Sequence, residues 1–87
     1  MQFTDYTYLE LRELASTIEA VLIPLGCTEQ QGPHMPVDFD TLMIANLCRD
    51  ISSGLDASGV PTLVMPALPF GPTPEHTNFG HGYVNLR

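Results

Sequence analysis

Apolar and polar residues follow each other in blocks along the chain, and the blocks predict two strands separated by a helix. Residues 20–26 (AVLIPLG) form a short apolar run of strand length. Residues 61–70 (PTLVMPALPF) form a second apolar run, with proline at both edges. Between them, residues 41–55 carry apolar side chains at helical spacing. The predicted apolar face of this helix consists of Ile44, Leu47 or Cys48, Ile51 and Leu55.

Capping signals support two helices. In residues 7–17, Thr7 and Glu10 have the spacing of a capping box, and three leucines supply an apolar face. The helix over residues 41–55 is preceded by Asp38 and Asp40, either of which could cap it. Its predicted end lies at Gly54 or Gly59.

The C-terminal part of the chain predicts a loop and a third strand. Residues 71–82 (GPTPEHTNFGHG) contain too much glycine and proline for a regular element. Residues 83–87 (YVNLR) are typical of a strand. Because a domain rarely stops within a strand, we expect residues 1–87 to be one domain that forms the N-terminal part of a larger fold.

The order strand, helix, strand predicts a βαβ unit, in which the two strands are parallel. We therefore expect an α/β fold of three layers, α/β/α, with a mostly parallel sheet that is truncated here. Ligands bind beyond the carboxyl ends of the strands in such sheets. Both irregular segments, 26–40 and 71–82, follow apolar strands, so they are expected to meet at that end and form a site.

Composition excludes several classes of partner. The 87 residues carry a net charge of −7, with no lysine and three arginines, which argues against nucleic acid and anionic membranes as partners. No apolar run approaches the length of a membrane span. Two cysteines without a secretion signal indicate free thiols in a reducing cytosol, so we expect a cytoplasmic protein.

Residues 26–40 (GCTEQQGPHMPVDFD) hold a mixed set of oxygen and nitrogen ligands. Glu29, His34 and Asp40 suit Zn²⁺ or Mn²⁺, with Fe²⁺ also compatible, better than Ca²⁺. Each residue also has a simpler interpretation. Asp40 could serve as a helix cap, and His34 could be a surface residue. Cys27 could be a nucleophile, or a small buried side chain, which is the commoner role of free cysteine.

The segment PLGCTEQQGPHMPVDFDT closely resembles the signature of the creatininase (creatinine amidohydrolase) family, Gly-x-x-Glu-Gln-His-Gly-Pro-His-x-Pro-x-x-x-Asp. The later segment LPFGPTPEHTNFGHGYVNLR is similar to the second conserved region of that family. The resemblance covers roughly residues 20–87. It implies an α/β/α fold and a pair of divalent metals that activate water against a cyclic or linear amide.

The resemblance also implies roles for individual residues. Glu29 corresponds to a metal ligand of the family, and Asp40 to the aspartate that bridges both metals. Gln31 stands where the family has a ligand histidine, so one metal position could be empty, weakly held or served by His34. His81 has the local appearance of a later metal-binding histidine but lies in a different region.

The combined hypothesis is a metal-dependent amidohydrolase that acts on a non-peptide C–N bond in a small polar molecule. Glu75 and His76 are expected to face the substrate as an acid–base pair, although a hydrogen-bonded structural pair is the alternative. Two other readings remain: a non-catalytic binding or assembly module, and an amidase that depends on Cys27. We expect a homo-oligomer, and an 87-residue chain that is weakly active or inactive alone.

Overall fold

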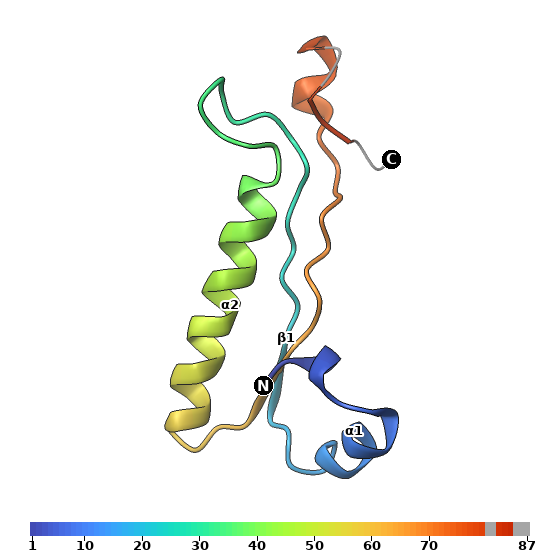
Figure 1. Ribbon diagram of the computed structural model, residues 1–87, viewed down its shortest axis with the longest axis vertical. Coiled ribbons are helices and arrows are strands. Elements are labelled where there is room, and N and C mark those ends of the chain that lie inside the picture. Colours follow the sequence, from blue (N-terminus) through green and yellow to red (C-terminus); the bar gives the residue numbers. More distant parts are fainter. Residues whose placement is uncertain (80–81, 85–87) are drawn as a thin grey trace.

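The computed structural model describes residues 1–79 and 82–84. The elements are η1 (Phe3–Asp5), α1 (Tyr8–Leu14), β1 (Ala20–Leu22), α2 (Phe39–Ala57), β2 (Thr62–Val64) and η2 (Pro74–Phe79), where η denotes a 3-10 helix. The molecule is elongated, 47 × 23 × 17 Å, and α2 runs alongside the strand segments (Figure 1). The loop before α2 and the helix η2 lie at the same end of the molecule (Figure 1).

The two strands form the parallel pair that the sequence predicts. Ala20 lies opposite Thr62 and Leu22 opposite Val64, and α2 connects the strands and packs against β2. The α/β class and the βαβ unit are therefore confirmed.

The strand segments stay paired beyond the regular ladder, with one irregularity. Leu22 pairs with Val64, whereas Leu25 bridges to Leu68, so the second segment contains one extra residue. The insertion falls around Pro66, whose missing N–H interrupts a ladder. Because pairing resumes after it, both segments deliver their following loops to the same place.

The face that α2 buries differs in part from the prediction. Cys48 and Ser52 are buried, whereas Leu47 and Ile51 are 49% and 43% exposed. The expected burial of Ile51 is wrong, because the stripe facing the strands runs through Ser52, whose hydroxyl lies 2.6 Å from Thr62 Oγ1. Among the described residues, neither α2 nor any other helix is long and apolar enough to cross a bilayer.

The two helix starts differ in how they are capped. At α1, Thr7 Oγ1 accepts from the Glu10 backbone N–H at 3.3 Å, and Glu10 Oε2 accepts from the Thr7 N–H at 2.7 Å, so the predicted capping box is confirmed. At α2, Asp38 occupies the N-cap position without a side-chain cap bond. Asp40 lies in the first turn, and its carboxylate accepts instead from Gln31. The predicted aspartate cap is therefore not made.

The C-terminal segment also departs from the prediction. Residues 74–79 form η2 rather than irregular loop, because proline is compatible with the first position of a helix and a 3-10 turn needs few residues. Tyr83 and Val84 lie outside any strand, and residues 85–87 lie outside the described part. The Val84 N–H donates instead to the Thr28 carbonyl at 2.9 Å.

Candidate metal centre

The start of α2 lies against the end of the first strand segment because of two small features. Thr41 Oγ1 donates to the Cys27 carbonyl at 3.0 Å. Gly26 permits this approach, since a Cβ there would lie 2.6 Å from the Thr41 Cα. Asp40, the residue before Thr41, is thereby placed beside the loop that carries Glu29.

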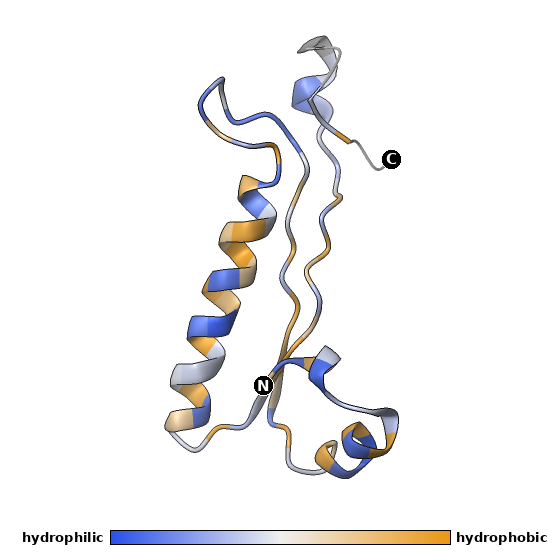
Figure 2. Cartoon of the chain, in the orientation of Figure 1, coloured by the Kyte–Doolittle hydropathy of each residue, from blue (hydrophilic) through white to orange (hydrophobic). Residues whose placement is uncertain are grey.

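Hydrogen bonds close that loop and connect it to the second segment. The Glu29 N–H donates to the Val37 carbonyl at 3.0 Å, and Thr28 Oγ1 donates to the Pro69 carbonyl at 2.7 Å. Gly32 has a φ of +86°, which favours glycine at the turn. Figure 2 shows mostly hydrophilic positions in this loop, in contrast to the apolar strand segments.

Glu29 and Asp40 meet around the side-chain amide of Gln31. Gln31 Nε2 donates to Glu29 Oε1 at 3.2 Å and to the two Asp40 oxygens at 3.3 and 3.1 Å. A neutral N–H₂ group therefore lies between two carboxylates. The amide nitrogen has no lone pair for a metal, so Gln31 could become a ligand only by turning its oxygen toward the carboxylates.

The neighbouring Asp40 disfavours the charged form of Glu29. A hydrogen bond with the Asp40 carboxyl, followed by burial and the Asp40 charge, raises the pKa of Glu29. The contact with His76 acts in the opposite direction and does not cancel the shift. A carboxyl group whose charged form is disfavoured by a nearby acid is stabilised in that form when a divalent cation binds it.

The second loop contributes to the same cluster. His76 Nε2 lies 2.9 Å from Glu29 Oε2, and both side chains are largely buried, with exposed fractions of 13% and 15%. Glu75 Oε1 lies 4.0 Å from His76 Nε2 and its side chain is 63% exposed. Ligand atoms of these three residues lie within 4.8 Å of one another. The predicted meeting of the two loops is confirmed.

Other candidate residues lie apart from this cluster. His34 is exposed, and within residues 1–79 and 82–84 no hydrogen bond or ion pair connects it to the carboxylates. Its role as a ligand stays a prediction. His81 lies outside the described residues. Cys27 is half-buried, and burial, followed by the Glu29 charge, raises the pKa of its thiol, which disfavours the thiolate that a nucleophile requires.

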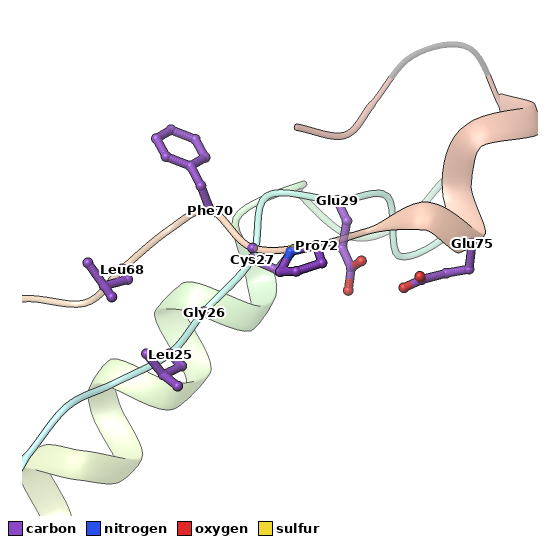
Figure 3. Close-up of a pocket in the computed structure, with 9 residues that line it drawn as sticks. Leu25, Gly26, Cys27, Glu29, Leu68, Phe70, Pro72 and Glu75 are labelled. Atoms are coloured by element: carbon purple, nitrogen blue, oxygen red, sulfur yellow. The ribbon is translucent and has the colours of Figure 1, made fainter. Parts of the chain in front are cut away.

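A pocket of about 330 Å³ adjoins the carboxylates (Figure 3). Its walls are mainly apolar and come from both strand segments, and Glu29 and Glu75 lie at one end with their carboxylates near each other (Figure 3). The main apolar lining residues are Leu25, Leu68, Phe70 and Pro72.

Sequence reasoning missed the role of Gln30. Its amide contacts both the Gly32 N–H and the His76 ring, so it connects the two loops. Nothing in the local pattern distinguishes it from a solvated glutamine. Only the tertiary contact with His76, which is 46 residues away in sequence, reveals it.

The parallel α/β unit carries carboxylates and a histidine beyond the carboxyl ends of its strands, and such a group of side chains could hold a divalent cation. A model of the creatininase family (creatinine amidohydrolase) matches residues 4–87. The chain therefore belongs to the creatininase family.

Curated and solved relatives agree with this assignment. A mycofactocin precursor peptide peptidase from Mycobacterium tuberculosis is 39% identical over 72 residues, which are 77% of this chain and 29% of that protein. A manganese creatininase has a TM-score of 0.82 at 24% identity, covering 99% of this chain and 34% of the other. A mutant creatininase of the Zn–Zn type has a TM-score of 0.73 at 26% identity, covering 98% and 33%.

The comparisons show how much of each relative this chain matches. The chain spans under a third of the length of the curated relative, and the manganese structure supports the fold alone. The metals named for the two structures, manganese and zinc, are the two expected from the sequence.

Proposed function

We propose that the protein is a hydrolase of amide C–N bonds that uses Zn²⁺ or Mn²⁺ held by Glu29 and Asp40. The observation that carries the proposal is the meeting of these two carboxylates, on separate elements, around one amide group. Their oxygens suit either cation. The raised pKa of Glu29 fits a site that a cation would relieve.

Each described side chain has a distinct part in this proposal. When bound, the cation would supply Lewis-acid polarisation of the amide carbonyl and a lowered pKa of water. Glu29 would bind and orient it from the first loop, and Asp40 from the first turn of α2. Glu75, which lines the pocket and is largely exposed, would carry a proton to or from the substrate.

Two substrate classes fit an amide hydrolase. The resemblance of residues 20–87 to the creatininase family favours a small polar molecule with a non-peptide C–N bond. The apolar pocket beside the carboxylates instead favours an amide that carries an apolar side chain, such as a short peptide. The name of the curated relative, a precursor peptide peptidase, supports the second class, and we keep both.

The test uses this chain extended to the length of the curated relative, because the match covers only 29% of that protein. Creatinine and a short peptide amide with leucine or phenylalanine are supplied in parallel, each with Zn²⁺ or Mn²⁺. We expect turnover of at least one that is abolished by a chelator and restored by metal. Chelator-resistant turnover, or none with metal loaded, would contradict the proposal.

The remaining proposals concern the location of the protein, the activity of the 87-residue chain alone and its oligomeric state. Both cysteines are free, which supports a cytoplasmic location. The 87-residue chain should show at most weak activity alone, since two loops supply few ligands. Homo-oligomerisation would complete the exposed edges of the two-stranded sheet.

A further inference from the structure

A continuous series of hydrogen bonds connects the backbone of the first loop to Glu29 through the second loop. The Gly32 N–H donates to Gln30 Oε1 at 2.8 Å. Gln30 Nε2 lies 3.4 Å from His76 Nδ1, and His76 Nε2 lies 2.9 Å from Glu29 Oε2. The other Glu29 oxygen accepts from Gln31.

The direction of every bond follows from the first one. A backbone N–H can only donate, so the Gln30 atom that it meets is the carbonyl oxygen. The Gln30 N–H₂ group must then face His76, where it donates to Nδ1. A ring nitrogen that accepts carries no proton, so the proton of the neutral imidazole is on Nε2. Nε2–H therefore donates to Glu29.

We infer that His76 is a positioning residue held as the Nε2–H tautomer by Gln30, and that it orients Glu29 rather than binding metal itself. With a proton on Nε2, the ring has no lone pair to offer at the atom nearest Glu29 and Glu75. The compact grouping of these three residues is then not a set of three ligands. Glu29 is instead fixed on both oxygens, by His76 on one and Gln31 on the other.

This inference rests on the proposed function only where it treats Glu29 as a metal ligand. The tautomer itself is a property of the protein without metal. Hydrogen bonds from neighbouring groups that fix a ligand typically change metal affinity by roughly 10–100-fold when lost. The two parts can therefore be measured separately.

The first measurement is the ring ¹⁵N spectrum of the histidine-labelled full-length protein, with His76 assigned by comparison with His76→Gln. We expect an unprotonated Nδ1 and a protonated Nε2 without metal, and the same pattern after addition of diamagnetic Zn²⁺. A protonated Nδ1 with a bare Nε2, or loss of the Nε2 proton on Zn²⁺ binding, would overturn the inference.

The second measurement changes Gln30. In Gln30→Glu, a carboxylate oxygen replaces the N–H₂ group opposite Nδ1, so Nδ1 should gain a proton. The matched control is Gln2→Glu, which adds the same charge far from the site and should leave the ring spectrum unchanged. An unprotonated Nδ1 in Gln30→Glu would show that Gln30 does not set the tautomer.

The third measurement is Zn²⁺ affinity by competition with a chelating dye. We expect His76→Ala to bind Zn²⁺ about 10–100-fold more weakly, and His76→Gln, whose amide can still donate to Glu29, to recover most of that loss. Equal affinities in the parent protein and His76→Ala would overturn the positioning role. If the parent protein binds no Zn²⁺, the proposed function fails, while the ring spectra still decide the tautomer.

Discussion

Two carboxylates at opposite ends of the parallel pair have opposite surroundings. Asp56, near the end of α2, accepts from the Thr62 N–H at 2.8 Å, from Thr62 Oγ1 at 3.0 Å and from the Met1 amino group at 3.1 Å. These donors, led by the Thr62 N–H, lower the pKa of Asp56. Glu29 meets another carboxyl group, Asp40, and its pKa is raised.

The surroundings of Asp56 and Glu29 differ in their effect on the stability of the fold. A carboxylate surrounded by donors stabilises the fold as it stands. Two carboxylates held together cost stability unless a cation or proton lies between them. The surroundings of Asp56 therefore favour its charged form in the folded protein, whereas the surroundings of Glu29 disfavour its charged form, as the proposed cation site requires.

The largest effect is expected for Asp40→Asn. This change removes one of the two carboxylate charges while keeping the size of the side chain. Loss of a side chain that only hydrogen-bonds to a metal ligand typically weakens metal binding by roughly 10–100-fold. Because Asp40 is proposed to be a ligand itself, Zn²⁺ affinity should fall by more than that. Zinc per chain after dialysis, measured by elemental analysis, checks it. Asp38→Asn is the matched control, because Asp38 is exposed and makes no side-chain cap bond. Full zinc content in Asp40→Asn would refute the ligand assignment.

A smaller effect on Zn²⁺ affinity is expected for Gln31→His, which adds a metal ligand instead of removing one. The amide nitrogen of Gln31 faces both carboxylates, whereas an imidazole offers a lone pair there. We expect Zn²⁺ affinity to rise by about tenfold, the low end of the effects of residues around a metal. Gln2→His adds the same ring elsewhere and serves as the control. Unchanged or weaker binding would show that the site is adapted to glutamine.

Much of the fold could be predicted because its signals are local. The βαβ order follows from two apolar runs and a helical spacing, and the capping box of Thr7 and Glu10 lies within four consecutive residues. The stripe of α2 that is buried could not be predicted, since the choice of Ser52 over Ile51 depends on a hydroxyl pair with Thr62. Of the predicted third strand, Tyr83 and Val84 lie outside any strand, and the Val84 N–H donates to the Thr28 carbonyl in the first loop, whereas residues 85–87 lie outside the described part.

The sequence predicted that Glu29, Asp40, Glu75 and His76 would share one site, and the structure brings Glu29 close to Asp40 and His76, while the roles of these residues and of His34 stay predictions. Spacing and resemblance identified Glu29 and Asp40, and the structure brings both together. The direction in which His34 points depends on the turn at Gly32 and on the bond that closes the loop at Val37, and neither is visible in the sequence.

Thr62→Val removes the hydroxyl that is one of the donors lowering the pKa of Asp56. Thr62 is fully buried, and its hydroxyl contacts both Ser52 and Asp56. Valine has the same shape but leaves these groups without that partner, so the free energy of unfolding should fall by about 1–3 kcal/mol. Urea unfolding of the metal-free protein measures it. Thr4→Val, at an exposed position, should change little, and a similar loss in both variants would contradict the argument.

The smallest effect concerns pH. Because the folded pKa of Asp56 lies below its ordinary value of 3.8, the folded state binds this proton less tightly than the unfolded state does. The contribution of Asp56 to stability is therefore fully present above about pH 4 and is lost as pH falls through the lower, folded pKa. Asp56→Asn should destabilise the protein at pH 6 and to a smaller extent at pH 3. Urea unfolding at both values checks this, with the exposed Asp50→Asn as control. An equal loss at the two pH values would show that the donors around Asp56 do not favour its charged form.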